Sequence, residues 1–78
     1  MNQEKSKSNY VVCLNNDGYL ASLEKGKIYK TLKDKEAESE GWLRVIDEDG
    51  EDYLYNKERF EYIELPNSLK RKLNKVYA

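Results

Sequence analysis

Histidine is absent from this 78-residue chain, and cysteine and proline each occur once. Without histidine, the sequence offers no cysteine–histidine nucleophile pair and no histidine-ligated metal centre. The single Cys13 cannot form an intramolecular disulfide, and it lies in the apolar run 10–14. This position favours a buried structural thiol over a nucleophile or a ligand. The sequence therefore predicts no metal site, no cofactor and no enzymatic activity.

Long hydrophobic runs are also missing. No segment approaches the roughly 20 apolar residues that a membrane-spanning helix needs. Residues 1–8 are polar and lack the apolar core of a signal peptide, and they are predicted to form a flexible leader. These absences predict a cytoplasmic protein with no membrane span.

What the chain does contain is charge and tyrosine. Charged residues make up 37% of the composition and hydrophobic residues 38%, with seven tyrosines. A chain of this length forms one domain near the lower limit for a self-sufficient core, so the aromatic rings must supply much of the buried area. Few residues then remain to enclose a cleft, and no small-molecule substrate is evident.

The charges divide along the chain. Residues 9–66 carry eight Lys/Arg and fourteen Asp/Glu, whereas residues 67–78 carry four cations and no acid. Leu69, Leu73 and Val76 recur at helical spacing after Pro66 and Asn67, which is a suitable N-cap. The tail is therefore predicted to be a basic amphipathic helix over 67–78. Docking of its apolar stripe on the body is favoured over presenting the stripe to a partner or to an anionic surface.

The central segment predicts a β-hairpin. Two strand-like runs flank Asp49 and Gly50, a dipeptide typical of two-residue hairpin turns. That loop would place aliphatic Leu43, Val45 and Leu54 on the core face, because side chains alternate between faces. The opposite face would carry Trp42, Arg44, Ile46, Tyr53 and Tyr55. The acidic run 47–52 does not have the spacing of a calcium-binding loop and is expected to be a solvated tip.

The remaining elements complete a small β domain. Strands are predicted over 10–14, 27–32 and 60–65, with a turn at 15–18 and a short 3₁₀ turn at 56–59. Residues 33–40 form a charged connection, in which a helical turn is one option. The fold class is therefore mainly all-β, with five strands and a short C-terminal helix.

This ordered series resembles an SH3-like barrel over about residues 9–65. The glycine at 26 before a strand, Gly41-Trp42 opening the next strand, the acidic hairpin 47–52 and the closing strand 60–63 carry the likeness. The chain is also similar to small stand-alone SH3-type proteins of bacteria and their phages, which have no assigned activity. The resemblance implies a five-stranded barrel whose binding tryptophan corresponds to Trp42.

The groove residues depart from those of peptide-binding SH3 domains. The run at 10–14 lacks the usual Ala-Leu-Tyr-Asp-Tyr motif, Asn56 stands where the groove proline would be, and Arg59 stands where the groove tyrosine would be. A polyproline ligand needs stacked aromatic walls. This specificity is therefore not expected, and Trp42 is interpreted either as a binding residue or as a ring that closes one end of the barrel.

The sequence leaves two functions open. The first is a non-enzymatic module that recognises a protein partner or self-associates. Its contact residues are predicted to be Trp42, Arg44, Tyr55 and Arg59. The alternative is association with RNA or the ribosome through the tail cations Lys70, Arg71, Lys72 and Lys75.

Overall fold

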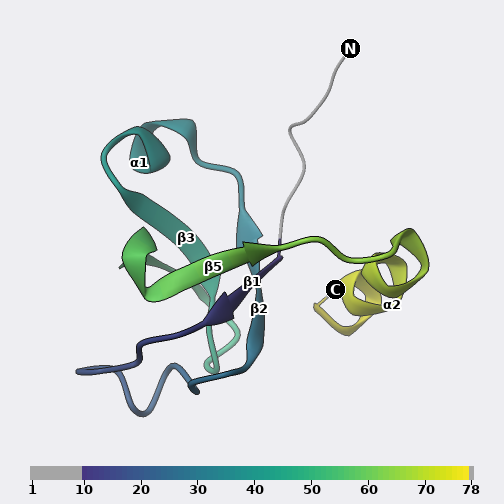
Figure 1. Cartoon of the computed structure of the whole chain (residues 1–78), viewed down its shortest axis with the longest axis horizontal. Helices are drawn as coiled ribbons and strands as arrows, with labels where there is room; N and C mark the ends of the chain where they lie inside the picture. The colour runs from purple at the N-terminus through teal and green to yellow at the C-terminus, as the bar shows by residue number, and fades with distance from the viewer. Residues whose placement is uncertain (1–9, 78) are drawn as a thin grey trace.

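The computed structural model describes residues 10–77, apart from the side chain of Tyr77, so the predicted leader at 1–8 lies outside the described residues. Within residues 10–77, five strands, two α-helices and one 3₁₀ turn (η1) follow one another (Figure 1). In order they are β1 Tyr10–Cys13, β2 Ile28–Leu32, α1 Lys35–Ser39, β3 Trp42–Ile46, β4 Asp52–Asn56, η1 Lys57–Arg59, β5 Phe60–Ile63 and α2 Asn67–Tyr77. The all-β class and the C-terminal helix are confirmed.

The strands form one antiparallel sheet in the order β4-β3-β2-β1-β5. Strand β1 pairs with both β2 and β5, so the first and last strands of the chain lie side by side. Within the part of the chain that the structure describes, β4 and β5 are the two edges and do not pair with each other. The expectation of a closed barrel is therefore not met; the sheet is open.

The core is formed by alternate residues of several strands together with Leu23, which lies in the long connection between β1 and β2. Its members are Val11, Cys13, Leu23, Tyr29, Leu43, Val45, Tyr55 and Phe60, with Tyr19 packed against them. Positions 11 and 13, like 43 and 45, are two apart and therefore point to the same face. Three of the eight core side chains are aromatic rings, as the shortage of aliphatic residues predicts.

The long connection between β1 and β2 is tied to the sheet at several points. Cys13 and Lys27 pair through a backbone hydrogen bond of 2.9 Å, and Gly26 donates to the Cys13 carbonyl at 2.7 Å. The side chain of Leu23 is buried in the core. The Ser22 carbonyl accepts from the backbone N–H of Glu48 at 3.0 Å, which joins this loop to the tip of the central hairpin. The connection is thus a packed part of the fold.

The central hairpin is present, but its register differs by one residue from the prediction. Ile46 pairs with Asp52, and the N–H of Asp47 donates to the Glu51 carbonyl at 3.2 Å. Residues 48–50 therefore form a loop of three residues rather than two. Asp47 sets this loop: its Oδ1 accepts from the N–H of Asp49, and its carbonyl accepts from the N–H of Gly50. Gly50 has φ +80°, a conformation that glycine adopts without strain.

The slip moves the side chains of β4 to the opposite faces, so that Tyr53 and Tyr55 lie opposite Val45 and Leu43, and Leu54 lies opposite Arg44. Tyr55 joins the core at 2% exposure, and Leu54 moves to the outer face beside Trp42 and Arg44. The predictions that Leu54 is a core residue and that Tyr53 and Tyr55 share the outer face of the sheet with Trp42 are therefore wrong. The physical reason for the changed register is the loop length, which depends on the buried Asp47 carboxylate.

The C-terminal helix lies apart from α1, on the other side of the molecule (Figure 1). It is held to the sheet by a polar contact, because the hydroxyl of buried Tyr10 donates to Asn74 Oδ1 at 2.6 Å. Within the predicted apolar stripe, Leu69 and Val76 remain exposed. Leu73 is half-buried, so the predicted stripe is covered only in part.

Candidate functional site

Helix α1 forms in the charged connection because its ends are capped. The Asp34 side chain accepts from the N–H of Ala37 at 3.0 Å, and the Glu38 carboxylate accepts from the N–H of Asp34 at 3.3 Å. Gly41 has φ +91° and ends the helix, and its N–H donates to the Glu38 carbonyl at 3.1 Å. This turn directs the chain into β3, so Trp42 begins the strand that lies beneath α1.

Arg44 connects α1 to β4. Its Nε and Nη2 donate to Asp34 Oδ2 at 3.0 and 2.8 Å, and its Nη1 donates to Asp52 Oδ2 at 2.9 Å. The guanidinium is thus held between two carboxylates from different elements. We conclude that Arg44 positions α1 over the outer face of β3 and β4, and that its own charge is already neutralised.

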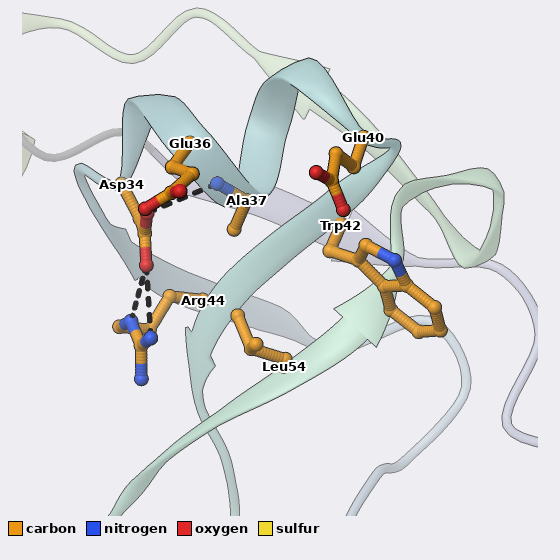
Figure 2. Close-up of a pocket in the computed structure, with 7 residues that line it drawn as sticks. All are labelled: Asp34, Glu36, Ala37, Glu40, Trp42, Arg44 and Leu54. Atoms are coloured by element: carbon orange, nitrogen blue, oxygen red, sulfur yellow. Dashed lines mark hydrogen bonds and ion pairs between the residues drawn. The ribbon is translucent and has the colours of Figure 1, made fainter.

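Beneath α1 lies a groove of about 430 Å³, called here the α1 groove. It is lined by Asp34, Glu36, Ala37, Glu40, Trp42, Arg44 and Leu54. Figure 2 shows Arg44, Leu54 and Trp42 in a row along its floor, with Glu40 beside the indole. This row follows from the register, because Leu54 pairs with Arg44, and residues 42 and 44 share one face.

A second groove of about 510 Å³, called here the β4 groove, adjoins the first and wraps the free edge of β4. It shares Trp42, Arg44 and Leu54 with the α1 groove and adds three further lining residues: Tyr19, Asp52 and Tyr53. The Trp42 side chain is 42% exposed and that of Leu54 is 37% exposed. Trp42 therefore lies at the surface where the two grooves meet, rather than within the core.

Two other predicted site residues do not line these grooves. Tyr55 lies beneath Tyr19 and Tyr53, with ring centroids 4.9 and 5.2 Å away, and burial raises its pKa to about 12. Its hydroxyl donates to Asp47 Oδ2 at 2.8 Å. Arg59 lies 4.7 Å from the Tyr19 ring and donates to the Asn15 carbonyl at 3.2 Å. The structure therefore brings together only Trp42 and Arg44 of the four predicted contact residues.

The α1 wall was not predicted as part of the site. Glu36, on α1, and Glu40, the residue that follows the C-terminal end of α1, both line the α1 groove. A local signal for the helix was present, because Asp34 is a favoured N-cap residue and Glu36 and Glu38 are acidic residues in the first turn. No local signal places this helix over Leu54, since that contact depends on the β3–β4 register.

The Asp34 carboxylate gives a first prediction. The N–H of Ala37, followed by the Arg44 guanidinium, holds the pKa of Asp34 below its ordinary value of 3.8. A lowered folded-state pKa means that this contribution to stability is complete above the unfolded pKa and is lost as pH falls through the folded pKa. We expect urea denaturation to show the protein losing stability on acidification below about pH 4.

Asp34→Asn is the matched variant, because asparagine also caps helices well. We expect the free-energy difference between wild type and this variant to be largest at neutral pH and to shrink on acidification. A difference that stays constant between pH 7 and about pH 2 would show that the charge of Asp34 is not involved.

The tail cations lie on a separate helix. Arg71, Lys72 and Lys75 are exposed on α2, and Lys70 is half-buried. They share no groove with Trp42. The two predicted contact regions are therefore distinct surfaces on opposite sides of the molecule (Figure 1).

The described residues contain neither a cluster of metal ligands nor a membrane-spanning helix. Across residues 10–77, no three Cys, Asp or Glu side chains gather closely enough to hold a metal ion. In the same part of the chain, neither helix has the length and apolarity to cross a membrane.

Comparison with known proteins found no matching family model, no matching curated protein and no matching solved structure.

Proposed function

We propose that this chain is a non-enzymatic interaction module that binds a protein partner through the surface around Trp42. The observation that carries the proposal is the half-exposed indole at the junction of two grooves. Tryptophan, tyrosine and arginine are the residue types that contribute most to binding energy at interfaces. Here Trp42, Leu54 and Arg44 line both grooves, and Tyr53 lines the β4 groove.

The strand order and the long β1–β2 loop support the further proposal that the domain is related to SH3-like barrels. In that interpretation Trp42 corresponds to the ligand-facing tryptophan, and η1 to the 3₁₀ turn before the last strand. Its setting would be the cytoplasm of a bacterium, as for the stand-alone proteins it resembles. Because the partner groups of a polyproline groove are missing, another class of ligand is proposed.

Affinity capture from native extract tests the proposal. The baits are the intact chain, Trp42→Ala and a control, Tyr62→Ala, which removes an exposed ring from β5 outside both grooves. We expect a partner protein to be retained by the intact chain and the control, and to fall by about tenfold or more with Trp42→Ala. Circular dichroism of each bait confirms folding. Equal capture by all three would contradict the proposal.

The second candidate is RNA or ribosome binding through α2. The exposed cations of this helix favour it, because clustered Lys and Arg side chains supply phosphate contacts. The same capture experiment decides between the two candidates when a nuclease arm and a bait with the four tail cations replaced by glutamine are added. If capture is lost after nuclease treatment and with the glutamine-substituted tail, but is unchanged in Trp42→Ala, the tail is established as the binding surface.

A further inference from the structure

The backbone of β4 has one side without a partner. At the loop end of the hairpin, the N–H of Asp47 donates to the Glu51 carbonyl, and at the other end the N–H of Lys57 donates to the Gly41 carbonyl. Because bonded positions alternate along an antiparallel ladder, every second residue of β4 points its N–H and C=O away from β3. These outward residues, called here the β4 edge, are Asp52, Leu54 and Asn56. Within residues 10–77, no backbone hydrogen bond from elsewhere in the chain reaches them.

The other edge of the sheet is protected, whereas β4 is not. On β5, the N–H of Phe60 already donates to the Lys57 carbonyl, and Pro66 follows the strand. Lysine and proline commonly block an edge, and β4 contains neither. Its Tyr53 and Leu54 are 55% and 37% exposed. An edge with unpaired backbone groups and exposed apolar side chains is a template for another strand.

We infer that β4 pairs with the β4 of a second copy of this chain, antiparallel and about a two-fold axis at Leu54. In this register Leu54 lies opposite its own counterpart, and Asp52 lies opposite Asn56 of the second copy. Every N–H and C=O of the β4 edge then has a partner, since these residues occupy the hydrogen-bonded positions of the new ladder. A shift by two residues leaves one residue of each edge unpaired, so the backbone favours this register.

The charges beside the β4 edge favour the same register. It brings Glu51 opposite Lys57 of the second copy, and the symmetry repeats this contact on the other side of the axis. Both side chains are exposed, and within residues 10–77 neither forms an ion pair. Across residues 51–57 no like charges face each other, because Asp52 meets an amide.

The Asn56 amide is oriented for this contact. Its Oδ1 accepts from the N–H of Glu58 at 2.9 Å, which leaves its NH₂ group to donate to the Asp52 carboxylate of the second copy. The β4 edge is thus complementary to itself in its backbone groups and in its charges. A second copy is therefore the occupant that the structure favours.

The interface is small, since one five-residue strand from each chain buries less than the roughly 1,000 Å² of a stable interface. We therefore expect a weak dimer, with a Kd of about 0.1 mM. The inference goes beyond the proposed function, because it rests on the backbone of β4 and not on the Trp42 indole. The capture experiment with Trp42→Ala tests that function separately.

Charge exchange tests the pairing. Sedimentation equilibrium between about 0.01 and 1 mM should show the average mass of the intact chain rising from one chain toward two. Glu51→Lys places like charges at both symmetric contacts and should weaken the dimer by about tenfold. Adding Lys57→Glu restores opposite charges, so the double variant should associate within about threefold of the intact chain. Circular dichroism confirms that each variant is folded.

Disulfide trapping tests the register. In Leu54→Cys the two new thiols face each other, with Cα atoms about 5.5 Å apart, which is within disulfide reach. Asp52→Cys is the matched control on the same edge, because its counterpart lies at the far end of the partner strand, about 14 Å away. We expect trapping of Leu54→Cys to be faster by about tenfold or more. Cys13 takes no part, since it is buried.

Three outcomes overturn the inference. They are a mass of one chain at every concentration, a Glu51→Lys defect that Lys57→Glu does not restore, and equal trapping of the two cysteine variants. In the first case, extract capture identifies another occupant. A partner that Trp42→Ala retains and Leu54→Lys loses would show that the β4 edge receives an extended segment of a different protein.

Discussion

Replacing Tyr55 with alanine should destabilise the domain by about 3–5 kcal/mol, because a buried ring leaves a cavity that the surrounding core cannot fill. The ring is 2% exposed and packs against Tyr19, Tyr53 and Phe60. Small domains have a total stability of about 5 kcal/mol or somewhat more. We therefore expect Tyr55→Ala to be largely unfolded at 37 °C, as measured by urea denaturation followed by circular dichroism.

Tyr55→Phe separates the ring from its hydroxyl. The hydroxyl donates to Asp47, which is itself buried, and lies 3.1 Å from Ser22 Oγ. Its removal should cost about 1–2 kcal/mol, because a buried carboxylate oxygen loses a donor. The domain should then remain folded at 25 °C, with a lower denaturation midpoint.

Tyr53→Ala is the positional control, since Tyr53 is the neighbouring ring on the same strand but is 55% exposed. Its loss should cost less than about 1 kcal/mol. The two-residue turn suggested by Asp49-Gly50 would instead place Tyr55 on the outer face and Leu54 in the core, so Leu54→Ala would then be the more destabilising substitution. A smaller effect for Tyr55→Ala than for Leu54→Ala would therefore contradict the three-residue loop.

The hairpin shows what the sequence predicts and where the prediction fails. The Asp49-Gly50 pair and the flanking apolar alternation correctly predict two paired strands. The loop length depends on Asp47, whose carboxylate bonds both the N–H of Asp49 and the Tyr55 hydroxyl. The second bond is a tertiary contact, so the local turn signal alone could not select between two and three residues.

The residues of the candidate site, like the hairpin, were predicted from the sequence only in part. Trp42 and Arg44 were identified from residue type and alternation alone, and both lie on the groove floor. The α1 wall could not be predicted, because Glu36 and Glu40 become part of a site only when Arg44 holds Asp34 against β3. The tail helix was predicted from its spacing, but the hydrogen bond between Tyr10 and Asn74 that joins it to the sheet is a polar contact without a sequence signature.

Cys13 should react with thiol reagents about a thousandfold more slowly in the native protein than in the unfolded chain. Its side chain is 0% exposed, and it lies on β1 between β2 and β5. Burial also raises the pKa of the thiol, which reduces the thiolate that would react. Labelling with an aromatic disulfide reagent at about pH 8, with and without urea, measures the ratio.

The size of this protection distinguishes a structural thiol from a functional one. A nucleophilic cysteine needs access and a lowered pKa, whereas Cys13 has neither. If its labelling requires global unfolding, the logarithm of the labelling rate should rise in Tyr55→Phe in proportion to the free energy of unfolding that is lost, because both report the same opening reaction. Labelling within about tenfold of the unfolded rate, or a rate indifferent to Tyr55→Phe, would mean that β1 separates from its neighbours while the rest of the domain stays folded. The sheet order argues against this, since β1 is paired on both sides and carries the centre of the core.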